Sequence, residues 1–153
     1  MPSVDIEVIA MTDRILDTLS RTLWGEARGE SDKGLIAVAW TIRNRVEIDL
    51  HGDGKPDWWG EGYELVCLKP YQFSCWNKGD PNYPYLMGLK AIPARDYVRM
   101  QEAATAVIYG HEPDPTGGAT HYHAKSMRKY PAWTNGATKT VVIGGHIFYK
   151  DVP

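Results

Sequence analysis

Residues 24–46 read WGEARGESDKGLIAVAWTIRNRV, and this stretch predicts the end of one helix and the whole of the next. Before and within it, apolar residues recur at steps of three and four, at Ile15, Leu16, Leu19, Leu23 and Ala27. This period predicts an amphipathic helix over residues 12–28. Thr12 or Asp13 is its expected cap, and Gly29 is its expected stop.

A second helix starts directly after this stop. Ser31 and Asp32 supply its start signal, because such side chains accept hydrogen bonds from the free N–H groups of a first turn. The helix is expected to reach about Glu47. Its predicted face comprises Leu35, Ile36, Ala39, Trp40, Arg43 and Val46. The two helices together predict a hairpin around the segment ARGES.

The rest of the chain changes from helix to strand. Residues 50–93 have little periodicity and are dense in Gly, Pro, Trp and Tyr, so we expect short turns that line a site. A third helix is predicted from about Ala94 to Tyr109. Beyond it, GATHYHA, TKTVVIG and HIFY are typical of strands, and the Gly144-Gly145 pair signals a hairpin. Helices followed by a small C-terminal antiparallel sheet make the expected fold class α+β.

The composition restricts the classes of function. The chain of 153 residues fits one domain, residues 1–153, and carries a formal net charge of -2. Without a broad cationic surface, nucleic acid and anionic membranes are poor candidates for partners. The N-terminus has no apolar run long enough for a signal peptide or a membrane span, so we expect synthesis in the cytoplasm and no membrane insertion. Cys67 and Cys75 are expected to be reduced.

Two carboxylates stand out in the opening stretch. Glu26 falls in the last turn of the first helix, where the dipole disfavours negative charge, and Glu30 is near enough to add like-charge repulsion. Both effects favour a protonated carboxyl, which a general acid needs in order to protonate the leaving oxygen of a glycosidic bond. On spacing alone, ordinary surface acids, one of them paired with Arg28, are the better interpretation.

Three blocks of the sequence resemble the SleB/CwlJ-type cell wall hydrolase family. The stretch from Trp24 to Val46 is similar to the start of that domain, with its Gly-Glu-Ala-Arg-Gly-Glu segment and a helix ending in Asn-Arg-Val. KPYQFSCW, residues 69–76, is similar to the central Phe-Ser segment, and GGATHYHA, PAWT and IGGHIFY are similar to the C-terminal signature. The blocks occur in order and extend to Tyr149, nearly the whole chain, so the resemblance is specific.

The resemblance implies a peptidoglycan-cleaving enzyme with a lysozyme-like domain, related to lytic transglycosylases. The family's catalytic glutamate maps to Glu26. A lytic transglycosylase cuts between N-acetylmuramic acid and N-acetylglucosamine with one acid/base, uses no cofactor or metal, and leaves a 1,6-anhydro product. A lysozyme-type muramidase stays open, because glycoside hydrolysis uses a second carboxylate. The sequence offers several, at Glu30, Asp53, Asp57, Glu61, Glu64 and Asp80.

Candidate substrate-binding residues come from the second and third blocks. They are Gln72, Phe73, Ser74, Trp76, Tyr122, His123 and Trp133. The polar ones can hydrogen-bond N-acetyl groups or hydroxyls, and the aromatic ones offer flat faces to sugar rings, although several are equally consistent with core positions. Along its strand, Tyr122 should face one side while His121 and His123 face the other. We place Tyr122 in the groove.

Other interpretations of the same residues predict different chemistry. His121, His123 and His146 on adjacent strands would suit a zinc-dependent N-acetylmuramoyl-L-alanine amidase, although the sequence has no His-Glu-x-x-His helix. Cys75 with a strand histidine would form a thiol peptidase pair. Residues 49–61 resemble a calcium loop with its closing acid displaced. A non-catalytic wall-binding module would use the aromatic residues only to hold glycan.

The expected partner is bacterial peptidoglycan, which a monomer would bind. The N-terminus shows no export signal. The sequence therefore favours a phage or prophage endolysin that reaches the cell wall through a membrane lesion.

Overall fold

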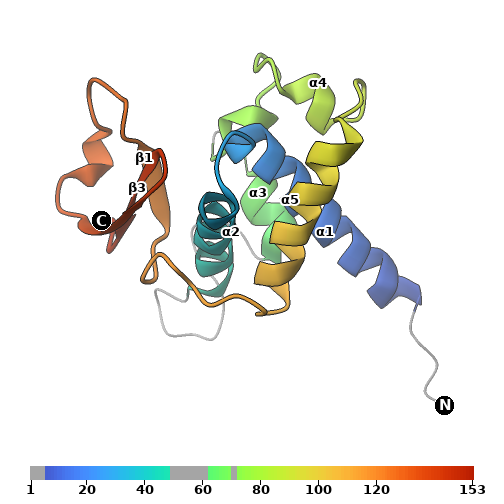
Figure 1. Cartoon of the computed structure of the whole chain (residues 1–153), viewed down its shortest axis with the longest axis horizontal. Coiled ribbons are helices and arrows are strands. Elements are labelled where there is room, and N and C mark those ends of the chain that lie inside the picture. Colours follow the sequence, from blue (N-terminus) through green and yellow to red (C-terminus); the bar gives the residue numbers. More distant parts are fainter. Residues whose placement is uncertain (1–5, 49–61, 70–71) are drawn as a thin grey trace.

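Three long helices form the body of the molecule (Figure 1). The structure is a computed structural model, and it describes residues 6–48, 62–69 and 72–153. Helix α1 spans Ile6–Ala27, α2 spans Asp32–Glu47 and α5 spans Ala94–Ile108. The predicted helices are confirmed, although α1 begins earlier than its periodicity indicates. No helix in the described part of the chain is long and apolar enough to cross a membrane.

Local hydrogen bonds set the connection between α1 and α2. The backbone N–H of Glu30 donates to the carbonyl of Ala27 at 2.9 Å, which closes the turn after α1. Ser31 is the N-cap of α2, and its hydroxyl accepts a hydrogen bond from the N–H of Gly34 at 3.3 Å. The predicted hairpin is thus confirmed. It leaves Glu26 on the last turn of α1 and Glu30 in the connection.

The apolar core lies between the long helices. Its fully buried members include Leu19, Leu23, Leu35, Val38, Ile42, Met100 and Val107. Burial of each large aliphatic side chain contributes about 1.5–3 kcal/mol, so this core supplies the main stabilisation of the helical body.

The buried face of α2 differs from the predicted one. It includes Val38, Ile42 and the charged Arg45, whereas the predicted Arg43 lies half-buried at the edge and pairs with Glu47 at 2.9 Å. Helix α2 contacts α1, α3 and α5 as well as the sheet, so it is covered on more than one side. A single apolar stripe therefore does not describe it.

Short helices fill the central segment that lacks periodicity, where the sequence predicts only turns. They are α3 (Gly62–Leu68), the 3-10 helix η1 (Ser74–Trp76) and α4 (Tyr83–Leu86). Helix η1 packs closely on α1 at Gly25, where an added Cβ would lie 2.6 Å from the Cβ of Cys75. Glycine at this position therefore permits the approach that brings η1 beside Glu26 of the preceding helix.

The C-terminal part forms a three-stranded antiparallel sheet. Strands β1 (His121–Ala124), β2 (Thr138–Ile143) and β3 (His146–Lys150) are arranged in the order β1-β3-β2. The predicted hairpin between β2 and β3 is confirmed, and Gly144 adopts a positive φ of 55° in its turn. The α+β fold class is confirmed as well.

The two faces of the sheet have different surroundings. Tyr122 and Phe148 are register partners on the face toward the helices, and Phe148 is fully buried there. The opposite face carries His121, His123 and Tyr149, which contact rings from the segment between β1 and β2. The predicted separation of Tyr122 from the two histidines is confirmed.

Polar contacts tie the sheet to α2. The amide of Asn44 donates to the carbonyl of Ala119 at 2.9 Å and to the carboxylate of Asp114 at 3.0 Å. Nε of the buried Arg45 donates to the carbonyl of Thr120. These contacts hold the chain just before β1, so they fix where Tyr122 enters the space beside α1. In Figure 1 the sheet accordingly lies on the α2 side of the helical body.

Candidate active site

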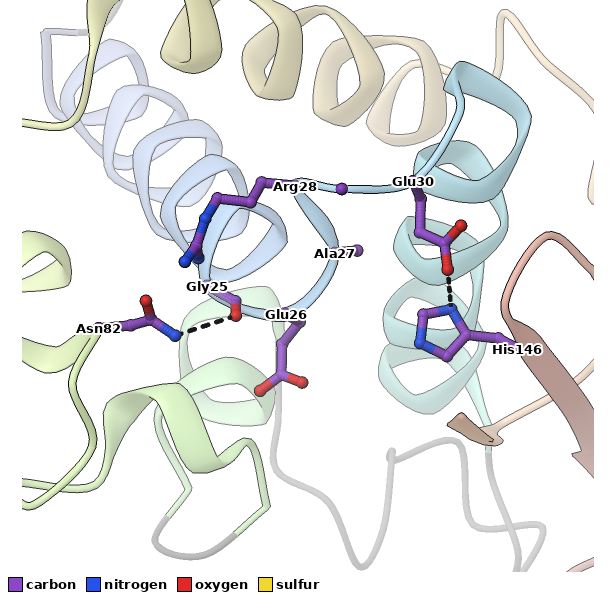
Figure 2. A pocket seen from close by; sticks show the side chains of 8 residues that line it. Gly25, Glu26, Ala27, Arg28, Glu30, Asn82 and His146 are labelled. Atoms are coloured by element: carbon purple, nitrogen blue, oxygen red, sulfur yellow. Dashed lines mark hydrogen bonds and ion pairs between the residues drawn. The ribbon is translucent and has the colours of Figure 1, made fainter. Parts of the chain in front are cut away.

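A cleft of about 550 Å³ opens at the C-terminal end of α1. Its size is within the range of small-molecule binding sites. The lining residues are Gly25, Glu26, Ala27, Arg28, Gly29, Glu30, Asn82 and His146 (Figure 2). The cleft therefore joins the Gly-Glu-Ala-Arg-Gly-Glu segment to the residue that precedes α4 and to the first residue of β3.

Glu26 lies at the junction of three segments. It is half-buried on the last turn of α1. The hydroxyl of Tyr122, on β1, donates to its Oε2 at 3.3 Å, and the backbone N–H of Cys75, in η1, points to its Oε1 at 3.5 Å. Donors from two other segments thus hold the carboxyl at the edge of the cleft.

Tyr122 is suited to remain a proton donor. Burial, and then the neighbouring Glu26, raise the pKa of Tyr122 well above that of an ordinary tyrosine. Its ring packs edge-on against His146 with centroids 5.0 Å apart, and it also contacts Phe148 at 5.8 Å. Because the phenol keeps its proton, it can donate to Glu26 whenever that carboxyl is ionised.

Arg45 supplies a buried positive charge behind the site. Burial lowers the pKa of its guanidinium to about 10, while Tyr122, Cys67 and Glu26 act in the opposite direction. The residue therefore stays charged at neutral pH. Its guanidinium lies 5.2 Å from the ring centroid of Phe73. Arg45 was not among the residues predicted from the sequence, although it recurs at helical spacing after Val38 and Ile42, where a buried cation is unusual.

Glu30 is the second carboxylate of the cleft, and it is already engaged. Its Oε1 lies 2.8 Å from Nδ1 of His146, and its Oε2 accepts from the N–H of Gly145 at 3.4 Å. The distance from Nδ1 of His146 to Oε1 of Glu30 is short, but the angle between the two groups is not that of a hydrogen bond. Burial lowers the pKa of His146, and Glu30 partly opposes this shift.

Arg28 does not serve as the partner of either carboxylate. Its Nη1 donates to the carbonyl of Trp24 at 3.1 Å, and its guanidinium lies 4.1 Å from the centroid of the Trp24 ring. The interpretation of the two acids as surface groups, one of them paired with Arg28, is therefore wrong. Glu26 and Glu30 face a cleft and have different partners.

Several predicted substrate-binding residues lie elsewhere. Phe73 is only 4% exposed and His123 only 5%, so both are part of the packed interior and cannot stack on a sugar. Trp133 contacts His121, His123 and Tyr149 on the sheet face that points away from Glu26. These three assignments are corrected, because each ring is used to pack the sheet.

Three further substrate-binding candidates lie in η1 or just before it, and their contacts differ. They are Gln72, Ser74 and Trp76. Nε2 of Gln72 donates to the carbonyl of Val66 at 2.7 Å, which stabilises the segment after α3. Nε1 of Trp76 donates to Thr22 at 2.9 Å, and its ring lines a separate hollow of about 500 Å³ between α1 and α4. Ser74 is exposed at the start of η1, next to Cys75, whose N–H points to Glu26.

The structure does not support the zinc or thiol alternatives. His146 shares a face with Tyr122, while His121 and His123 occupy the opposite face. Across residues 6–48, 62–69 and 72–153, no three His, Cys, Asp or Glu side chains are grouped as metal ligands. The proposed calcium loop, residues 49–61, lies outside the described residues.

Both cysteines are free and buried, as expected. Burial raises the pKa of Cys67 to about 12. Burial and the neighbouring Glu26 also raise the pKa of Cys75. Neither residue therefore provides the thiolate that a cysteine peptidase needs.

Comparisons with known proteins agree with this architecture. The Cell Wall Hydrolase family matches residues 29–149, a segment that includes Glu30 and begins just after Glu26. No curated protein matches the chain in sequence. The catalytic domain of the Bacillus cereus SleB protein shares 24% identity with a TM-score of 0.63, over 90% of this chain and 91% of that one.

A second solved structure is similar to the same extent. It is the catalytic domain of the germination-specific lytic transglycosylase SleB from Bacillus anthracis, with 25% identity and a TM-score of 0.62. The likeness covers 89% of this chain and 93% of that chain. The fold is thus that of the SleB catalytic domains, and the chain belongs to the Cell Wall Hydrolase family of peptidoglycan-cleaving enzymes.

Proposed function

We propose that the chain is a lytic transglycosylase in which Glu26 acts first as general acid and then as general base. Glu26 would protonate the oxygen that links C1 of N-acetylmuramic acid to N-acetylglucosamine, and the C1–O bond would break as that proton is transferred. The resulting carboxylate would take the proton of the muramic 6-hydroxyl while O6 attacks C1. The product is a 1,6-anhydro ring, and Glu26 is protonated again.

The observation that carries this proposal is the difference between the two acids of the cleft. Glu26 faces the cleft with two donors, and neither of them neutralises it. Glu30 is instead held against His146 and Gly145. A retaining or inverting hydrolase needs a second carboxylate that is free to act as nucleophile or base. Among the described residues that line the cleft, Glu26 alone has that freedom, which suits a mechanism with one acid.

The surroundings of Glu26 fit the second stage of this cycle. After proton transfer, the hydroxyl of Tyr122 and the N–H of Cys75 donate to the new carboxylate, and the buried charge of Arg45 stabilises it electrostatically. None of these groups takes the proton itself, because the phenol of Tyr122 and the guanidinium of Arg45 keep theirs at neutral pH. The base of the second step is therefore Glu26.

We also assign three substrate contacts. The amide of Asn82 lines the cleft with Glu26, the hydroxyl of Tyr122 contacts the carboxyl from β1, and Ser74 is exposed next to Cys75, whose N–H points to Glu26. They offer hydrogen bonds to the N-acetyl and hydroxyl groups of the sugar. The similar Bacillus anthracis domain is named as a lytic transglycosylase, which also favours this reaction. The role as a phage or prophage lysis enzyme stays a prediction.

Mass spectrometry of the soluble products from purified peptidoglycan tests the proposal. Wild-type enzyme should release muropeptides with 1,6-anhydro ends, which are lighter by one water than hydrolysed ends. Glu26→Gln keeps the shape and removes the acid, so these products should fall by about 10²–10⁴-fold. Reducing-end muramic acid from the wild type would indicate a muramidase. Activity that survives in Glu26→Gln would move the chemistry to another residue.

A further inference from the structure

Glu30 and His146 both line the cleft and contact each other (Figure 2). Glu30 belongs to the connection between α1 and α2, and His146 is the first residue of β3. Their side chains approach to 2.8 Å, and the carboxylate also accepts from the N–H of Gly145. We name this pair the Glu30–His146 contact. It links the helical body to the β2–β3 hairpin at the mouth of the site.

The hairpin is shaped to receive the carboxylate. An added Cβ on Gly144 would lie 2.6 Å from Oε2 of Glu30, and one on Gly145 would lie 3.1 Å from Oε1. On the helical side, an added Cβ on Gly34 would lie 2.9 Å from the Cβ of Glu30. Larger residues at these positions would push the carboxylate away. The glycines therefore permit a close approach that a surface ion pair does not need.

The backbone of Glu30 is also fixed on the helical side. Nη2 of Arg99, on α5, donates to the carbonyl of Glu30, and Nη1 donates to the carbonyl of Arg28 at 3.2 Å. Nε of Arg99 pairs with Asp32 at 3.0 Å. One arginine thus holds the connection against α5. The backbone of Glu30 is therefore fixed relative to α5, and its side chain can hold the hairpin from this fixed position.

The rings of His146 and Tyr122 connect Glu30 to the carboxyl of Glu26. The ring of His146 packs edge-on against Tyr122 with centroids 5.0 Å apart, and the hydroxyl of Tyr122 donates to Glu26. The other polar ties of the sheet, from Asn44 and Arg45, hold the segment before β1. The Glu30–His146 contact is placed to control β3 and the orientation of Tyr122.

We propose that Glu30 is a positioning residue, which acts through His146 to hold Tyr122 at hydrogen-bonding distance from Glu26. The proposal rests on the proposed role of Glu26 as acid and base. Glu30 itself neither receives a proton from the substrate nor attacks it. Its effect on the reaction passes through the hydrogen bond between Tyr122 and Glu26.

Two substitutions separate the reach of the side chain from its charge. Glu30→Gln keeps the length and removes the charge, whereas Glu30→Asp keeps the charge and is one methylene too short for the hairpin. Each should lower kcat by about 10-fold with little change in KM, because a small misplacement of the catalytic groups is costly. Glu102→Gln makes the same chemical change on the exposed side of α5 and should leave kcat unchanged.

A double-mutant cycle with Tyr122→Phe provides the decisive test. If Glu30 acts through Tyr122, adding Glu30→Gln to Tyr122→Phe should lower kcat by less than 3-fold, well below its effect of about 10-fold in the wild type. His146→Gln should behave in the same way. Thermal unfolding of each variant, measured alongside, confirms that the fold is retained.

Other results would overturn the proposal. Glu30→Asp with wild-type kcat would show that the charge alone matters. Multiplicative effects of Glu30→Gln and Tyr122→Phe would give Glu30 a catalytic role of its own. A lower Tm with unchanged kcat would leave Glu30 a purely structural residue. The products of the wild type test the proposed function separately, since the coupling can be measured on glycosidic cleavage of either kind.

Discussion

Replacing Tyr122 with phenylalanine removes one oxygen from the site and leaves the ring in place. The lost hydroxyl donates to Glu26 at 3.3 Å. A hydrogen bond to a charged group contributes about 1.5–3 kcal/mol, and 3.3 Å is long for O–H···O, so we take about 1–2 kcal/mol. If this bond stabilises the carboxylate that forms as the proton leaves, kcat should fall roughly 5- to 30-fold.

The assay is the rate of release of soluble muropeptides at saturating peptidoglycan. Tyr149→Phe is the matched control, because that hydroxyl lies 2.9 Å from Nε2 of His123 on the opposite face of the sheet. The control should lower the Tm and leave kcat unchanged. Wild-type kcat in Tyr122→Phe would refute the reasoning, as would an equal loss in both variants, since the effect would then come from the sheet and not from Glu26.

Three further perturbations follow from the packing and the pKa shifts. Gly25→Ala places a Cβ 2.6 Å from the Cβ of Cys75, so it should cost about 1–3 kcal/mol in chemical unfolding and lower kcat by displacing η1. Burial, with Arg45 adding to it, lowers the pKa of His121 from 6.5 to about 4. The unfolded chain therefore binds this proton first, so the protein should lose stability as the pH falls from 6.5 towards 4 in thermal melts. The thiols of Cys67 and Cys75 should not react with an aromatic disulfide reagent at neutral pH until the protein unfolds, because burial raises the pKa of both.

The helices were predictable because their signals are local. A period of three and four residues marks α1 and α5, and the cap at Ser31 marks the start of α2. The face of α2 was not predictable from its period, because neighbours cover it on several sides. The same tertiary packing explains why the burial of Arg45 was not predicted. The free-energy cost of burying its charge is offset in part by the hydrogen bond from its Nε to the carbonyl of Thr120.

Aromatic residues were the least predictable part of the site. A ring that stacks on sugar and a ring that fills a core have the same sequence pattern. The alternation along β1 separates Tyr122 from His123, but it does not say which face meets the helices. Trp133 packs on the outer face because the chain between β1 and β2 folds back over the sheet. Glu30 and Gly145 are 115 residues apart, so only the fold reveals their contact.

The Gly-Glu-Ala-Arg-Gly-Glu segment gives its two carboxylates different partners because α1 ends between them. On a continuous helix, residues four apart would share one face and repel each other. Here Ala27 is the last helical residue, so Glu26 keeps the direction of the last turn toward Tyr122, whereas Glu30 turns toward His146. A substitution that extended α1 through Gly29 would return both acids to one face. It should therefore impair the reaction even with both glutamates present, because the acid would lose the donor from β1 and the hairpin would lose its support.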